Sequence, residues 1–465
     1  MSPTLALLLW LVLLFALFNF DPARNVTTSP ALWVPLIWLT IVGSRLPSQW
    51  LDPSAKIGAV QAVEQGNPLD ALIYSLLILL ALAILAFRSF NWNGFLSRNI
   101  PLIAYLCFAL LSICWSDFRF ITFKRWIRDS GNYLVLLVVL SDPNQLETIR
   151  TLLRRLCYLL IPLSVLLLKY YPQLAVRYNY WSGLPENVGA ATSKNMLGVL
   201  CLVSGIFLFW DIAMRWSARN RSSTKRILFI DFVLFFMTMW LLQKSASSTS
   251  ELCFILGCLV IALTHSRLMR SHPRFFLTSI PVGICLYLVL TFAFGIDLNA
   301  LVAQLVGKDP TLTGRTVIWS AVLSVHTNPL VGAGYECFWL GARLTQVWQL
   351  TGVGINEAHN GYLEVYLNLG IVGLLLVGAL LIASYRSICR RVRRDPAFGS
   401  LSLALWTILL FYNVSESAFK GHLIFLAFLL VAMTVPGRRA VSERAHVSGR
   451  WHARSSASFR HRLSL

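Results

Sequence analysis

The sequence predicts an all-α, polytopic integral membrane protein with about 12 to 13 transmembrane helices and one large external loop. Three observations support this prediction. Of the 465 residues, 57% are hydrophobic and 13% are charged, and the mean hydropathy is +0.66, which is not the composition of a soluble domain. Apolar runs near the length that crosses the hydrocarbon layer, about 20 residues, recur along the chain. Lysines and arginines gather in short segments between these runs.

The apolar runs give the expected helices in order. The run at 131–140 crosses a membrane only if its helix begins near Phe120, and the run at 31–43 is short, so the expected number is 12 or 13. The first run has no basic residues before it and no small-residue cleavage site after it, so we interpret it as a retained helix. The runs are 4–20, 31–43, 70–87, 100–115, 131–140, 152–168, 196–213, 227–243, 251–265, 275–294, 361–384, 399–412 and 420–435.

The basic loops predict the orientation of the helices, because lysine and arginine accumulate on the cytoplasmic side. The clearest basic loops are 214–226, 266–274 and 385–395, and counting spans backwards adds 143–155 and 88–99. The same parity places residues 295–360 on the external side. It also makes the segments 116–130, 169–194, 244–250 and 413–421 external.

These elements divide the chain into five segments. Residues 1–114 hold N-terminal transmembrane helices without a motif, and residues 115–294 hold central helices with basic external ends. Residues 295–360 form the large external loop that carries Arg315 and His359. Residues 361–436 hold the C-terminal helices. Residues 437–465 form a basic cytoplasmic tail whose composition predicts disorder.

The net charge of +20 does not predict a nucleic-acid partner. Most of it lies in the basic loops and the tail, where arginines beside membrane spans set topology and meet anionic lipid headgroups. The nine cysteines form no CxxC pair and predict neither a disulfide framework nor a metal site. The lipid bilayer is the partner that the composition indicates.

Several basic residues stand on the external side, where topology disfavours them. Cations that face one compartment could neutralise a doubly phosphorylated leaving group. The alternative is that these side chains anchor the helix ends by snorkelling. The residues are Lys124, Arg125 and Arg128, which have helical spacing, and Lys194, Lys244 and Arg315.

His359 is the external histidine that lies in a polar cluster at the start of a predicted helix. Glu357 and Asn360 flank it and could orient its ring, as a general base requires. The alternative is a histidine that caps or packs the helix. Arginine binds phosphate and histidine accepts protons, so Arg315 and His359 together suggest transfer from a phosphorylated lipid to a hydroxyl group.

Four motifs in this region resemble the signature of the bacterial O-antigen ligase and polymerase superfamily. They are Gly314-Arg315 with Trp319, residues 328–335 (NPLVGAGY), 358–363 (AHNGYL) and 368–373 (NLGIVG). Four further segments resemble the branch of exopolysaccharide polymerisation proteins: 115–117 (WSD), 124–129 (KRWIRD), 193–198 (SKNMLG) and 413–417 (NVSES). The resemblance covers roughly residues 115–420.

This resemblance implies a metal-independent glycosyltransferase of the bacterial inner membrane that needs no cofactor. Such an enzyme takes an oligosaccharide from undecaprenyl pyrophosphate on the periplasmic side and joins it to a sugar hydroxyl of a glycan acceptor. His359 would be the general base and Arg315 would bind the donor pyrophosphate, with Glu357, Asn360 and Glu416 in support. A chain-length regulator and a flippase of the same pathway are the expected partners.

The sequence departs from the family pattern at Ser248, where the family commonly has a basic residue. Lys244, one helical turn earlier, could supply the charge from the same face, or Arg125 or Arg128 could. Lys194 is a further candidate contact for the donor pyrophosphate. The exopolysaccharide-like motifs favour a polymerase. The alternatives are a ligase that attaches polymer to lipid A core and, from another class, a polysaccharide flippase or transporter, although we find no internal repeat.

Overall fold

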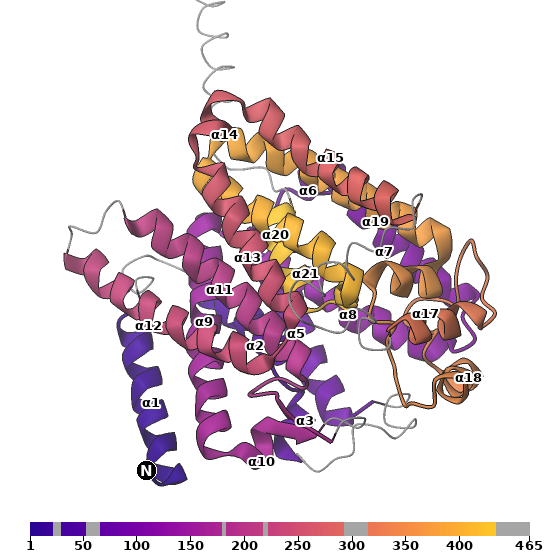
Figure 1. The fold of residues 1–465 in the computed structure, drawn as a ribbon, viewed down its shortest axis with the longest axis horizontal. Helices are drawn as coiled ribbons and strands as arrows, with labels where there is room; N and C mark the ends of the chain where they lie inside the picture. Colours follow the sequence, from indigo (N-terminus) through magenta and orange to yellow (C-terminus); the bar gives the residue numbers. More distant parts are fainter. Residues whose placement is uncertain (22–28, 53–65, 179–182, 217–221, 293–314, 434–465) are drawn as a thin grey trace, which may run out of the picture.

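The computed structural model describes residues 1–21, 29–52, 66–178, 183–216, 222–292 and 315–433 (Figure 1). Within these ranges the protein is a bundle of helices with one two-stranded hairpin, so the all-α prediction is confirmed. Residues 295–314 of the predicted external loop, including Gly314 of the first motif, lie outside the described residues. So do the predicted tail at 437–465 and the last two residues of the run at 420–435.

The N-terminal part consists of apolar helices whose starts carry capping side chains. Ser2, Asn67 and Asn91 each accept a hydrogen bond from a backbone N–H in the first turn of a helix, which satisfies donors that have no partner inside the helix. The chain turns by 86° between α6 and α7. The elements are α1 (Pro3–Asn19), η2 (Pro30–Leu32), α2 (Trp33–Val42), α3 (Pro47–Leu51), α5 (Pro68–Phe87), α6 (Trp92–Arg98), α7 (Ile100–Leu111) and η3 (Ser112–Cys114).

The central part consists of helices with one short β-hairpin between α10 and α11. The helix α8 begins at Arg119, which agrees with the predicted start near Phe120. The hairpin pairs Val176 with Asn187 in an antiparallel register. The elements are α8 (Arg119–Leu140), α9 (Gln145–Tyr170), α10 (Pro172–Ala175), β1 (Val176–Tyr178), β2 (Pro185–Asn187), α11 (Lys194–Trp216), α12 (Ser222–Ser245), α13 (Ser248–Thr264), α14 (Arg267–Ser271) and α15 (Pro273–Phe292).

The C-terminal part supplies both the center of the bundle and the loop that carries the motifs. In Figure 1, α21 lies in the middle of the bundle, whereas α17 and α18 lie at the lower right. Its elements are α17 (Arg315–Ser324), α18 (Gly341–Thr351), α19 (Gly361–Arg394), α20 (Pro396–Ser415), η5 (Ala418–Lys420) and α21 (Leu423–Ala432).

The predicted number of 12 or 13 spans is not confirmed, although every predicted apolar run lies on a helix. Six helices in the described part of the chain are long and apolar enough to cross a membrane, or seven if the bent pair α6 and α7 is one span. The six lie in α5, α9, α11, α12, α19 and α20. Several apolar helices therefore support a multi-pass membrane protein.

The helix α21 explains part of this difference. It has 10 residues, all of them buried, and a helix of that length rises only about 15 Å, half the thickness of the hydrocarbon layer. Its side chains pack against α8, α11, α19 and α20. Hydropathy alone does not distinguish such a buried core helix from a span.

A buried ion network joins three helices of the central part. Arg154 of α9 pairs with Asp211 of α11 and, at 3.2 Å, with Asp231 of α12, and Arg215 lies 2.9 Å from Asp211. The Arg154 side chain is 2% exposed and both aspartates are 0% exposed. Removing one partner would leave a buried charge uncompensated, so this network fixes how α9, α11 and α12 pack.

The helix α19 is interrupted at Gly370, and the segment 328–334 fills the break. Gly370 adopts φ +63°, which favours glycine, and a Cβ there would lie 2.3 Å from the backbone of Leu330. The carbonyl oxygens of Pro329 and Leu330 accept hydrogen bonds from the backbone N–H groups of Ile371 and Val372 at 2.9 and 3.1 Å. The backbone groups that the break leaves without helical partners are thus satisfied by the loop.

Candidate active site

Glu416 brings the two predicted site residues together. Arg315 Nη2 donates to Glu416 Oε1 at 2.6 Å, and His359 Nδ1 lies 3.4 Å from Glu416 Oε2. Asn195, at the start of α11, donates to the same Oε1 at 2.9 Å. Glu416 follows the last residue of α20, and its side chain is 6% exposed. One buried carboxylate therefore joins α11, α17, α20 and the start of α19.

Capping and close packing at the start of α19 explain why His359 lies next to Glu416. The side chain of Asn360 accepts hydrogen bonds from the N–H groups of Tyr362 and Leu363, both at 3.0 Å, and so begins α19. Gly361 packs so closely on Asn413 that a Cβ would lie 1.9 Å from its Oδ1. The start of α19 is thereby held against the end of α20, next to Glu416.

The electrostatic environment of His359 is acidic. Glu357 Oε1 lies 3.2 Å from His359 Nδ1. Burial alone lowers the pKa of His359, but the charges of Glu357 and Glu416 outweigh burial and raise this pKa above its ordinary value of 6.5. Burial conversely raises the pKa of Glu357, yet His359 and the nearby cations hold it below 4.5. Both carboxylates contact Nδ1, which leaves Nε2 as the ring atom for proton transfer.

The same three side chains could hold a metal ion, since one ligand atom from each of Glu357, His359 and Glu416 lies within 4.8 Å of the others. One nitrogen and two carboxylate oxygens are acceptable ligands for several divalent metals. However, Glu416 Oε1 already receives hydrogen bonds from Arg315 and Asn195. The Arg315 guanidinium would also repel a cation at this place, so the arrangement fits an anion near Arg315 better than a metal.

The other predicted phosphate-binding residues occupy different surroundings. Lys194 pairs with Glu186 at 2.8 Å and directly precedes Asn195 of the site. Lys244 is exposed at the end of α12. Arg125 donates to the backbone oxygen of Glu336, and Arg128 Nε lies 2.8 Å from Asp129 Oδ1. These last two form a second polar cluster on α8, to which Tyr335 also donates a hydrogen bond.

Lys244 and Ser248 do not share a helical face, contrary to the prediction from the sequence. The helix α12 ends at Ser245, Ala246 adopts φ +50°, and α13 begins at Ser248, so the two positions lie on different helices and share no helical face. Ser248 itself is close to the site, because the hydroxyl of its neighbour Thr249 contacts that of Ser415 at 2.9 Å. The segment where the sequence departs from the family pattern therefore borders Glu416.

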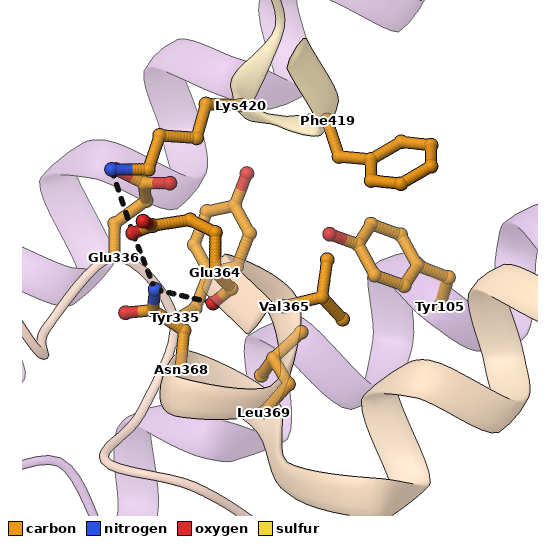
Figure 2. Close-up of a pocket in the computed structure, with 9 residues that line it drawn as sticks. All are labelled: Tyr105, Tyr335, Glu336, Glu364, Val365, Asn368, Leu369, Phe419 and Lys420. Carbon is orange, nitrogen blue, oxygen red and sulfur yellow. Dashed lines mark hydrogen bonds and ion pairs between the residues drawn. The ribbon is translucent and has the colours of Figure 1, made fainter. Parts of the chain in front are cut away.

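Sequence reasoning missed two buried residues beside the site, Glu364 and Lys420. Glu364 Oε1 accepts hydrogen bonds from Lys420 Nζ at 2.7 Å and Trp339 Nε1 at 2.6 Å. The available signals were a carboxylate five residues after His359 in an apolar helix and one more cation in the segment 413–421, which the sequence predicts to be external. Figure 2 shows both residues at a cavity of about 20 Å³, room for about one water molecule, lined by Tyr105, Tyr335, Glu336, Glu364, Val365, Asn368, Leu369, Phe419 and Lys420.

The chain is similar to a described protein family and to a described protein. Residues 188–378 match the family described as O-antigen ligase. This part of the chain is similar to the O-antigen ligase family. The matched region contains Asn195, Arg315, His359 and Glu364 and ends before Glu416. The chain is also similar to the exopolysaccharide production protein ExoQ of Rhizobium meliloti (strain 1021), with 24% identity over 360 residues, 73% of this chain and 78% of the relative.

Proposed function

We propose that this protein is a membrane glycosyltransferase of the O-antigen ligase and polymerase family that polymerises exopolysaccharide or O-antigen repeat units. It would transfer an oligosaccharide from undecaprenyl pyrophosphate to a sugar hydroxyl at the periplasmic face of the bacterial inner membrane. The observation that carries this proposal is the contact of both Arg315 and His359 with the buried carboxylate of Glu416. These contacts bring an arginine, a residue type that can bind phosphate, and a histidine, a residue type that can accept a proton, to the same carboxylate.

In this mechanism His359 takes the proton of the acceptor hydroxyl. Its Nδ1 faces Glu357 and Glu416, so the neutral ring carries its proton on Nδ1 and presents an unprotonated Nε2. The acceptor oxygen attacks the first carbon of the donor sugar while its proton moves to Nε2. Glu357 and Glu416 then stabilise the imidazolium. A positioned base of this kind contributes about 100- to 10,000-fold to the rate.

Arg315 acts on the leaving group. As the new glycosidic bond forms, the bond from the sugar carbon to the pyrophosphate oxygen breaks, and the electron pair leaves with the lipid pyrophosphate. The guanidinium has five N–H donors, and the contact with Glu416 uses one nitrogen. Its other donors can bind phosphate oxygens and stabilise the developing charge. A second phosphate contact would come from Lys194, Lys244, Arg125 or Arg128.

Two alternatives differ in what the site does with the donor. A ligase would use the same residues with lipid A core as acceptor, and the polymerase is favoured here because the similar ExoQ is described as an exopolysaccharide production protein. A flippase or transporter would need no base beside the cation. The paired Arg315 and His359 favour chemistry over transport.

The test is complementation of a deletion strain with the wild type, His359→Ala or Arg315→Ala at matched membrane expression. Polymer length and lipid-linked repeat units are measured by gel and mass spectrometry. His326→Ala is the matched control, since His326 is an exposed histidine just after α17. We expect both site variants to lose long polymer and accumulate single lipid-linked units, and the control to retain polymer.

Other outcomes identify the alternatives. If finished polymer remains on its lipid carrier and only its attachment to lipid A core fails, the protein is a ligase. If lipid-linked units accumulate only on the cytoplasmic side, the transporter alternative is correct. Unchanged polymer in both site variants would refute the assignment of Arg315 and His359.

A further inference from the structure

Both backbone polar groups of Ala358, the residue before His359, bind side chains. Glu364 Oε2 accepts a hydrogen bond from the backbone N–H of Ala358 at 3.0 Å, and Trp319 Nε1 donates to the carbonyl oxygen of Ala358 at 2.9 Å. Ala358 is 0% exposed. Both polar groups of this residue are thus bound by side chains from α17 and α19 rather than by water.

The next residue, His359, has an unusual backbone conformation. Its φ is +48°, in the left-handed region that residues other than glycine visit rarely. Such a conformation persists only where the surroundings impose it. The two hydrogen bonds to Ala358 lie directly on its N-terminal side, and the capping side chain of Asn360 lies directly on its C-terminal side.

Glu364 is itself firmly held. The residue is 2% exposed, and its Oε1 accepts from Trp339. The same oxygen accepts from Lys420 and, at 3.1 Å, from Asn368 Nδ2 (Figure 2). Its Oε2 is left for the N–H of Ala358. Four hydrogen-bond donors restrain the Glu364 carboxylate to one orientation. The carboxylate therefore determines where the backbone N–H of Ala358 lies.

We propose that Glu364 and Trp319 are positioning residues that fix the His359 imidazole against Glu357 and Glu416 by holding the backbone N–H and C=O groups of Ala358. This inference rests on the proposed function, in which His359 is the base. Neither residue touches the substrate. Their effect reaches the reaction through the backbone of His359, which sets the direction of the Nε2 atom toward the acceptor hydroxyl.

The main test replaces Trp319 by Phe, which keeps an aromatic ring but removes the N–H donor to Ala358 and part of the indole ring. Trp348→Phe is the matched control, because it removes the same atoms while the Trp348 N–H donates to the backbone oxygen of Ile355, at 2.6 Å in the same loop, and not to Ala358. Rates are measured with lipid-linked repeat units and the purified full-length protein in lipid nanodiscs.

For Trp319→Phe we expect kcat to fall about 5- to 10-fold, the loss that one hydrogen bond carries, with KM unchanged. The rise of kcat with pH should also move to lower pH, because a misaligned His359 is less stabilised as imidazolium by Glu357 and Glu416. A residue that merely stabilises the fold would change the amount of active protein but not this pH dependence. Trp348→Phe should show neither change.

A second variant removes the other hydrogen bond to Ala358 and so tests the positioning role independently of Trp319. In the double variant Glu364→Met with Lys420→Met the ion pair is removed as a unit, so neither of the two charges is left without the other, and the acceptor for Ala358 N–H is lost. It should show a larger fall in kcat and the same direction of pH shift. If both variants keep the wild-type kcat and pH dependence while His359→Ala is inactive, the positioning role is refuted and the proposed function stands. If His359→Ala remains active, the proposed function is refuted and this inference with it.

Discussion

Glu416→Gln tests whether one carboxylate organises the site. The substitution keeps the size of the side chain and removes its charge. In the wild type, Oε1 accepts from Arg315 at 2.6 Å and from Asn195 at 2.9 Å, and Oε2 faces His359 at 3.4 Å. An amide has a single acceptor oxygen, and its NH₂ group would point either at the guanidinium or at the imidazole N–H, both of which are donors.

The size of the effect follows from the burial of the pair. The side chains of Arg315 and Glu416 are 13% and 6% exposed, so solvent screens their interaction little. A hydrogen bond to a charged group contributes about 1.5 to 3 kcal/mol. If that interaction orients Arg315 in the transition state, its loss lowers kcat by about 10- to 150-fold.

The assay is the initial rate of polymer formation from lipid-linked repeat units in nanodiscs, with thermal unfolding measured on the same samples. Asp117→Asn is the control. Asp117 pairs with Arg343 at 2.7 Å but is 62% exposed, and exposed ion pairs contribute about 0 to 1 kcal/mol. A Glu416→Gln protein that is folded and within about twofold of the wild-type rate would refute the reasoning.

Three further predictions concern the same region. Since Glu357 and Glu416 raise the pKa of His359, kcat/KM should rise with pH through a value above 6.5. Glu357→Gln should move this rise to lower pH, and an unmoved profile would contradict the assignment of His359 as the base. Chelation with EDTA should leave the rate unchanged despite the metal-compatible geometry, and a loss that a divalent cation restores would show a metal site. Gly370→Ala should lower the free energy of unfolding by about 1 to 3 kcal/mol through strain at positive φ, measured as a lower Tm, because its Cβ would meet the Leu330 backbone.

Much of the fold was predictable from the sequence because apolar runs determine where helices form in a membrane protein. All the predicted runs lie on helices, and the start of α8 was placed within one residue. The number of spans was not confirmed, because the same apolar composition serves a buried core helix such as α21. The sides of the membrane and the segment boundaries stay predictions.

The candidate site was predictable in its chemistry but not in its contacts. Arg315, His359 and Glu416 were selected as polar residues in motifs, and the structure brings them together. Glu364 and Lys420 were missed because a buried ion pair combines two residues 56 positions apart. Their pairing depends on the approach of α19 and η5, which no local sequence pattern contains.

The interruption of α19 has a consequence for how the protein is made. A continuous helix satisfies its own backbone and can enter the bilayer alone. The helix α19 cannot, because the N–H groups of Ile371 and Val372 are satisfied by a loop some 40 residues earlier in the chain. During folding, the loop 328–334 and the helix α19 therefore have to pack together before the backbone at the break is satisfied. Because the loop is synthesised before the helix, the active site can form only after both segments are complete.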